Sequence, residues 1–114
     1  MDLGARLTEL QQRTHQHREL LLTEEAAKTA LVMPFLQALG YDVFNPSEVV
    51  PEFTADVGTK KGEKIDYAIC SDGKVSILVE CKISSSDLNV NHASQLYRYF
   101  SVTDARLAIL TNGV

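Results

Sequence analysis

Residues 65–82 read IDYAICSDGKVSILVECK, and this stretch decides the fold. Apolar residues alternate along both ends of it, as in two β-strands joined by a tight turn at 71–73. A two-residue turn would pair apolar with polar side chains across the strands. A three-residue turn with Gly73 in the left-handed region instead pairs Ile65 with Val79 and matches the apolar positions throughout. We therefore expect a hairpin with the three-residue turn.

The second face of this hairpin carries charged residues. The expected register places Asp66 opposite Leu78 and Lys64 opposite Glu80, so that Asp66 and Glu80 are diagonal neighbours with Lys82 two residues further on. Two carboxylates this close repel each other unless a positive charge lies between them. Mg²⁺ takes one or two protein carboxylates, and Lys82 could orient or deprotonate water or offset charge on phosphorus. The alternative is a solvated sheet face with cross-strand ion pairs.

The length and composition are those of one globular domain. The chain has 114 residues, of which 45% are hydrophobic and 23% charged. Leucines at both ends of residues 3–22 and a polar middle indicate a helix lying on the surface. We therefore divide the chain into an N-terminal helical segment, 1–22, and a core, 23–114.

The charge balance limits how the chain can bind DNA. A net charge of −4 argues against a free-standing DNA-binding protein, because phosphate affinity comes from clustered Lys and Arg. A small basic patch next to the hairpin either contacts phosphate or faces water; it consists of Lys60, Lys61 and Lys64. No apolar run approaches the roughly 20 residues of a membrane span, and no signal peptide is evident, so we expect a cytoplasmic location. Cys70 and Cys81 are expected as small buried residues.

A second helix is predicted over about 24–39, after the N-cap residue Thr23. Its apolar stripe is expected at Ala27, Leu31, Phe35 and Ala38. Pro34 lies inside it, so we expect a kink or a missing hydrogen bond near Ala30. Glu24 falls on the line of the apolar stripe, which leaves two interpretations: a first-turn acid that reaches water, or a carboxylate aimed at the interior.

The remaining segments complete an α/β pattern. Residues 49–53 are predicted to form an edge strand, since they contain a proline. A helix over about 91–102 places Gln95 and Tyr99 on one face, where they are either functional or simply a surface hydrogen bond and a buried tyrosine. Residues 107–110 are expected to form a short buried strand, parallel to a core strand because a helix precedes it.

Taken together, these residues resemble a known group of nucleases. Asp66, Glu80 and Lys82 match the Asp…Glu-x-Lys signature of the PD-(D/E)xK superfamily, although Ile65 stands where the name of the superfamily has Pro. More narrowly, the chain resembles the N-terminal nuclease domain of type I restriction enzyme R subunits and their prophage-encoded relatives. The matching stretches are Glu24-Glu25-Ala26-Ala27-Lys28, Pro34-Phe35-Leu36, Leu39-Gly40-Tyr41, Val50-Pro51-Glu52, and the Gln-x-x-x-Tyr element of Gln95 and Tyr99.

The resemblance implies both a fold and an activity. The fold is α/β with a restriction-endonuclease-like core, in which helices flank a mixed sheet of about four strands. The activity is Mg²⁺-dependent hydrolysis of DNA phosphodiesters, with Mn²⁺ as a substitute ion, in a restriction or phage-defence system. Asp66 and Glu80 would bind the metal, Lys82 would be catalytic, and Glu24 would be a further acidic ligand or orienter. The contrasting hypothesis is a non-catalytic module with a nuclease-like fold that serves DNA docking or assembly.

The partners implied are DNA and further domains or subunits. Relatives of this kind carry helicase or translocase and specificity functions elsewhere, and an oligomer is compatible with them. Asn112-Gly113 is a strong hairpin signal that only Val114 follows, so we expect that the chain is either truncated or a fragment of a longer polypeptide.

Overall fold

A mixed four-stranded β-sheet forms the centre of the computed structural model, which describes residues 2–54, 64–82, 88 and 90–112. The strands lie in the order β1-β2-β3-β4, with the first three antiparallel and β4 parallel to β3. Their bounds are β1 (Val49–Phe53), β2 (Ile65–Ser71), β3 (Lys74–Cys81) and β4 (Leu107–Thr111). The expected α/β class and the mixed sheet of four strands are therefore confirmed.

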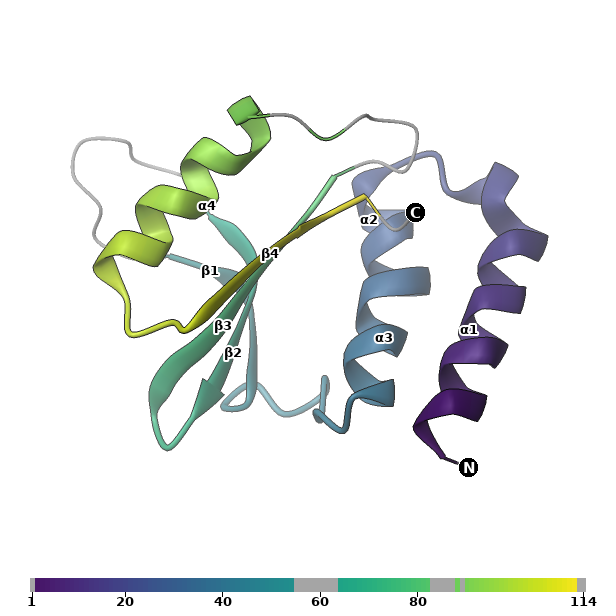
Figure 1. The fold of residues 1–114 in the computed structure, drawn as a ribbon, viewed down its shortest axis with the longest axis horizontal. Coiled ribbons are helices and arrows are strands. Elements are labelled where there is room, and N and C mark those ends of the chain that lie inside the picture. The colour runs from purple at the N-terminus through teal and green to yellow at the C-terminus, as the bar shows by residue number, and fades with distance from the viewer. Residues whose placement is uncertain (1, 55–63, 83–87, 89, 113–114) are drawn as a thin grey trace.

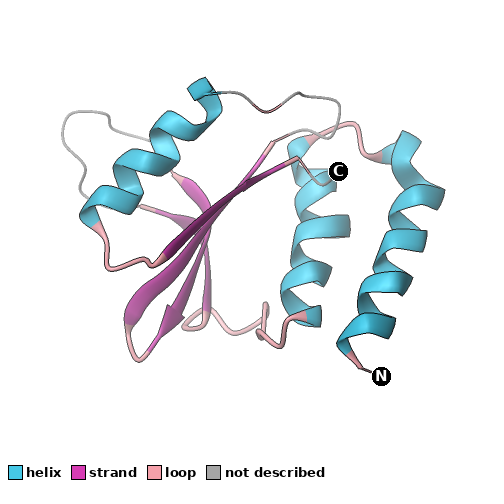
Figure 2. Ribbon diagram, in the orientation of Figure 1, coloured by secondary structure: helices cyan, strands magenta, loops and turns pink. Residues whose placement is uncertain are grey.

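Helices cover both faces of the sheet (Figures 1 and 2). Helix α4 (Val90–Val102) lies on one face, and a long helical segment lies on the other. That segment consists of α2 (Glu24–Ala27), the π-helical turn η2 (Lys28–Val32) and α3 (Met33–Ala38). Outside it, α1 (Leu3–His17) packs against α3, followed by the short 3-10 turn η1 (Arg18–Leu20). None of the residues of α1 is buried, as expected for a surface helix.

The irregular turn η2 has a clear cause in the sequence. Thr23 caps the segment, since its Oγ1 accepts a hydrogen bond of 3.0 Å from the Ala26 N–H. Pro34 has no N–H to donate to Ala30, and the π-helical turn covers this position. The predicted irregularity near Ala30 is thus confirmed.

The π turn also shifts the apolar stripe of this helix. The buried residues that contact the sheet are Ala27, Val32 and Leu36, which are separated by five and then four residues. A five-residue step is the spacing of a π turn, so every position after it moves by one. The expectation that Phe35 lies on the central stripe is therefore wrong, and this side chain is partly exposed.

The two hydrophobic clusters lie on opposite faces of the sheet. The first joins the long helical segment to Tyr67, Ile69 and Val79. The second joins α4 to Ala68 and Leu78. Since both faces are covered, both sets of alternating residues in β2 are buried, which explains why Ala68 is as inaccessible as its apolar neighbours.

The hairpin turn differs from the expected one. Ser71 pairs directly with Lys74, so the turn has two residues, and both Asp72 (φ 53°) and Gly73 (φ 78°) have positive φ as in a type I′ turn. A bulge then leaves Ser76 between the partners of Ile69 and Cys70. The three-residue turn is therefore wrong.

The turn and the bulge together move the register by an even number of residues. Val79 pairs with Tyr67 rather than with Ile65, which is a shift of two positions. Because side chains alternate with a period of two, such a shift keeps the residues beyond the bulge on their predicted faces, whereas Val75, between the turn and the bulge, packs with Ala68 and Leu78 on the other face. The expected pairing of Asp66 with Leu78 is nevertheless wrong, since Ala68 takes that place.

The last strand lies at an edge and is not buried as expected. Leu107 is 57% exposed, and Ala108 and Ile109 are also accessible. Its parallel pairing with β3 is confirmed, as is the edge position of β1. The proposed hairpin signal at Asn112-Gly113 lies partly outside the described residues.

Candidate active site

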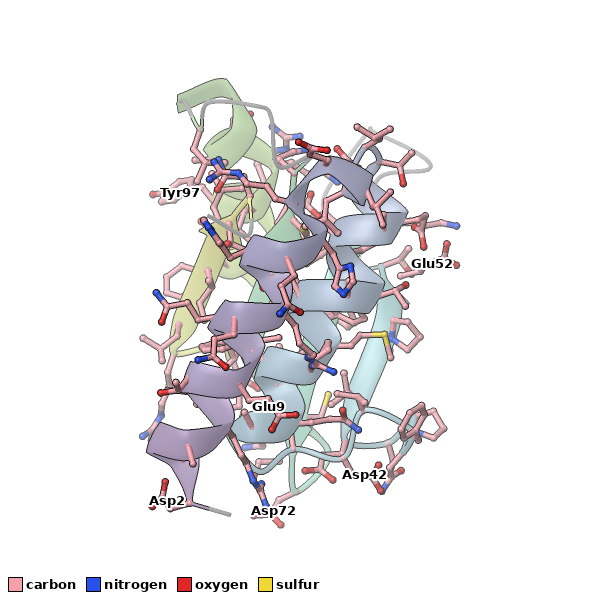
Figure 3. The ribbon with its side chains drawn as sticks, turned by 90° about the vertical axis from the view of Figure 1, so that its right-hand side faces the viewer. Asp2, Glu9, Asp42, Glu52, Asp72 and Tyr97 are labelled. Carbon is pink, nitrogen blue, oxygen red and sulfur yellow. The ribbon has the colours of Figure 1, made fainter. Side chains whose placement is uncertain are left out.

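The charged residues of the hairpin gather where β2 begins and β3 ends. Figure 3 shows Glu52, which lies at this end of the sheet, far from Asp72 in the hairpin turn at the other end. The pairing of Tyr67 with Val79, continued by one residue, places Asp66 directly opposite Glu80. The two carboxylates are therefore closer neighbours than the diagonal arrangement expected from the sequence.

Backbone hydrogen bonds fix the two carboxylates relative to each other. The Asp66 N–H donates to Glu80 Oε1 at 3.2 Å, and the Cys81 N–H donates to Asp66 Oδ2 at 2.7 Å. Each carboxylate is thus held by the strand that carries the other. Such cross-strand anchoring leaves little rotational freedom to either side chain and preorganises the pair.

Glu80 is a buried carboxyl group in an unfavourable electrostatic position. The residue is 4% exposed, and among the described residues it is the only charged one that is buried. Burial, together with the hydrogen bond and the negative charge of Asp66, raises the pKa of Glu80 to about 8. The carboxyl pair therefore holds a proton near neutral pH unless a further positive charge approaches it.

Lys28 supplies a positive charge that the sequence did not lead us to expect at this site. Its Nζ lies 3.3 Å from Asp66 Oδ1, and it also pairs with Glu25. The residue reaches Asp66 from the start of η2, on the helical segment that packs on the face carrying Tyr67 and Val79. The sequence could have indicated Lys28 as a neighbour of the site, because Lys28 is one helical turn after Glu24 and lies on the same side of the helix.

Lys82 follows directly after β3 and is half-buried. Its N–H donates to the Thr111 carbonyl oxygen at 2.8 Å, which ties this end of β3 to β4. The positive charge of Lys82 favours the ionised form of Glu80 and so opposes the increase of its pKa. The structure thus brings Lys82 into electrostatic contact with the carboxylate pair.

Glu24 lies in the first turn of α2 and is exposed to solvent. It is nevertheless close enough to the end of β3 that its charge contributes to raising the pKa of Cys81. Burial is the larger cause, and with the charges of Asp66 and Glu24 it raises that pKa to about 11. Of the two interpretations of Glu24, the acid that reaches water describes its exposure, and its role as a ligand stays a prediction.

Helix α4, which packs on the face of the sheet that carries Ala68 and Leu78, supports the backbone next to the site. Gln95 Nε2 donates to the Lys64 carbonyl oxygen at 2.9 Å, immediately before β2 begins. Tyr99 is 1% exposed and its ring lies edge-on to that of Phe53, with 6.2 Å between the centroids. Gln95 therefore positions the backbone that leads to Asp66, and Tyr99 is part of the hydrophobic core.

The basic patch is only partly described. Lys64 is exposed and its Nζ lies 3.8 Å from Glu52 Oε2, so a surface ion pair offsets its charge. Lys60 and Lys61 lie outside the described residues. Contact of these lysines with phosphate stays a prediction.

The donor groups of the site fit Mg²⁺. The described residues contain no group of three or more His, Cys, Asp and Glu side chains that could hold an ion, so the protein would offer the two carboxylates of Asp66 and Glu80. Mg²⁺ uses oxygen ligands and keeps several waters, and it is commonly bound through one or two carboxylates. Burial, and after it the hydrogen bond and charge of Asp66, raise the pKa of Glu80, and a bound cation would stabilise the ionised form of this carboxyl group.

Comparison with known proteins gives one family. The family model described as "Type I restriction enzyme R protein N terminus" matches residues 23–114. No curated protein and no solved structure gives a match to the chain. In the part of the chain that the structure describes, every helix is too short or too polar to cross a membrane. The match covers the whole of the sheet, both flanking helical layers and each candidate site residue.

Proposed function

Because the chain belongs to the family of type I restriction enzyme R protein N-terminal domains, we propose that it is a Mg²⁺-dependent DNA endonuclease domain that acts in a restriction system. The observation that carries this proposal is the direct opposition of Asp66 and Glu80 across β2 and β3, with Lys82 beside them. A solvated sheet face would not bury Glu80 to this extent, so that alternative is disfavoured.

The residues of the site would have different roles in phosphodiester hydrolysis. Mg²⁺ bound to the carboxylates would act as a Lewis acid toward the phosphate oxygens. Asp66 and Glu80 would hold the ion with their remaining oxygens while the backbone N–H groups keep both side chains in place. Lys82 would offset the negative charge that develops on the phosphoryl group, or orient the attacking water.

The DNA contacts must be weak in this chain alone. With a net charge of −4, the chain has little general affinity for phosphates, and Lys64 is paired with Glu52. We therefore propose that further domains or subunits, with helicase or translocase and specificity functions, supply most of the DNA binding. Nicking by this chain should be detectable at low salt, where the few contacts count most.

The test is nicking of supercoiled plasmid at low ionic strength with Mg²⁺ or Mn²⁺, with and without a chelator. The wild-type chain should nick in the presence of the ion, and Lys82→Ala and Asp66→Ala should not. Lys74→Ala is the matched control, because Lys74 is exposed at the hairpin turn, at the opposite end of β3 from the site. Equal nicking by wild type and both site variants would refute the catalytic assignment.

The same experiment separates the contrasting function. A non-catalytic module for DNA docking would bind a labelled duplex without nicking it under any metal condition. Its binding would then be insensitive to Asp66→Ala, since the carboxylates would have no role in it. Metal-dependent nicking that is lost in both site variants would exclude this alternative.

A further inference from the structure

Lys28 is a nearly buried cation held between two carboxylates. Its side chain is 13% exposed, and its Nζ lies 3.3 Å from Oδ1 of Asp66, whose side chain is 17% exposed. On the other side it lies 2.5 Å from Oε1 of Glu25, which is 80% exposed. The ammonium group thus bridges an interior acid and a surface acid.

Lys28 donates to the oxygen of Asp66 other than the one that accepts the hydrogen bond from the backbone of β3. Asp66 Oδ2 accepts the Cys81 N–H at 2.7 Å, and Oδ1 accepts from Lys28. Burial alone would lower the pKa of Lys28, but the hydrogen bond to Glu25 and the charge of Asp66 raise it above its ordinary value. Lys28 therefore keeps its positive charge across the whole range of pH in which the protein would act.

We propose that Lys28 is a resident counterion that competes with the divalent cation for Oδ1 of Asp66, and that Glu25 receives its ammonium group when the cation binds. The inference rests on the proposed function, since it takes Asp66 and Glu80 as the metal-binding carboxylates. It makes Lys28 a positioning residue that sets the affinity of the site for its ion.

The competition follows from the geometry. A divalent ion on Asp66 would lie next to the ammonium group, and two positive charges at such a distance repel strongly in a partly buried site. Lysine has a long, flexible stem, so its head group can move outward while the stem keeps its packing. Glu25 is three residues earlier on the same helical segment and faces solvent, so it can keep its partner in the outer position.

The first experiment compares metal binding by the wild-type chain and Lys28→Met, which keeps much of the aliphatic stem. Mn²⁺ binding is measured by isothermal titration calorimetry, with the shift in melting temperature at saturating Mn²⁺ as a second readout. A single nearby charge changes the affinity of a carboxylate for a proton by about tenfold or more, and we expect a similar effect, a Kd about tenfold lower in Lys28→Met.

The matched control is Lys74→Met, which changes the net charge equally but lies at the far end of β3. Its Kd should equal that of the wild type. A Kd in Lys28→Met that equals or exceeds the wild-type value would overturn the inference while metal binding itself still supports the proposed function. Absence of binding in both proteins would overturn both proposals, whereas binding by Lys28→Met alone would support the competition.

A substitution at the surface, which leaves the interior unchanged, tests the same inference because it should change the Kd for Mn²⁺ in the opposite direction. Glu25→Gln removes the outer partner, so Lys28 should stay on Asp66 and the Kd for Mn²⁺ should rise by about three- to tenfold. The effect should disappear when Glu25→Gln is combined with Lys28→Met. An equal increase in both backgrounds would mean that Glu25 acts only as a distant negative charge, and the inference would fail.

Discussion

The metal-free protein should lose stability as the pH rises from about 5 to about 8, because Glu80 must give up a proton in a buried position. Its pKa is about 8 in the folded protein and 4.5 for an ordinary glutamate. Between these values the unfolded chain has lost the proton and the native protein retains it. The native state therefore binds more protons, and the free energy of unfolding falls as the pH rises.

The magnitude follows from the size of the pKa shift. Each pH unit inside the window lowers the free energy of unfolding by at most about 1.4 kcal/mol, so two units cost at most about 3 kcal/mol. Glu80 is 4% exposed, so solvent screens the effect little, but the native carboxyl group itself begins to lose its proton as the pH approaches its pKa of about 8, which reduces the slope there. We expect about 2 kcal/mol between about pH 5.5 and about pH 7.5.

The variant Glu80→Gln isolates this contribution, because an amide can accept the Asp66 N–H bond and does not titrate. Urea denaturation in the presence of a chelator, followed by far-UV circular dichroism, gives both stabilities, and other titrating groups cancel in the difference. The variant should gain about 2 kcal/mol relative to wild type over this range. A difference that is independent of pH would refute the reasoning, and a gain for wild type would show an ionised, well-compensated Glu80.

Three further changes have expected outcomes. Gly73→Ala should lower the free energy of unfolding by about 1 kcal/mol, since φ is 78° there, and an unchanged urea midpoint would contradict the type I′ turn. Gln95→Ala removes the hydrogen bond to the Lys64 carbonyl and should cost about 1 kcal/mol in the same assay; no loss would mean that the bond is not formed in solution. In thiol labelling followed by mass spectrometry, Cys70 should react before Cys81, because burial raises both pKa values and Cys81 is inaccessible, with its pKa at about 11; faster labelling of Cys81 would contradict its placement.

The sequence predicted the strands and helices better than the connections between them. The alternation of apolar residues and their helical spacing were sufficient to predict the order of the strands and helices. Pro34 was sufficient to predict the irregular helical turn that precedes it. The hairpin turn was mispredicted because two solutions keep the apolar faces together. A three-residue turn does so, and so does the two-residue turn at Asp72 and Gly73 followed by a bulge at Ser76. Face matching cannot choose between them, since they differ by an even number of residues.

The edge strand shows a different limit of the same reasoning. Residues Leu107–Thr111 are strongly apolar, and an apolar run of this length is typical of a buried strand. In the structure β4 pairs with β3 on one side and lies at the end of the order β1-β2-β3-β4. Whether a strand is central or at an edge depends on what else joins the sheet, and a local pattern does not contain that information.

Within the candidate site, the sequence indicated that the charged residues of the hairpin lie together, but it did not indicate the contact of Lys28 with them from the helical layer. Asp66 and Glu80 share a face because of a period that can be counted along the chain. The contact of Lys28 with Asp66 spans 38 positions in sequence and requires the helical segment to pack against the sheet so that the start of η2 lies beside Asp66. Periodicity gives the direction of a side chain on its own element and leaves the opposing element undetermined.

The side of the helix that carries Glu24 does point toward the carboxylate pair. The residue on that side that contacts Asp66 is, however, Lys28 and not Glu24. Glu24 was aligned with the apolar stripe, but in the first turn of α2 it lies too close to the end of the helix to be covered. Lys28 is four residues later on the same face, where the segment packs on the sheet, and there its ammonium group meets Asp66. The face that points at the carboxylate pair thus presents a positive charge to it, with the acids Glu24 and Glu25 at the rim. With a cation inside and acids outside, the negative charge of the metal-free site is already partly neutralised, so the Mg²⁺ binding that we propose would be an exchange of cations rather than the filling of a bare negative site.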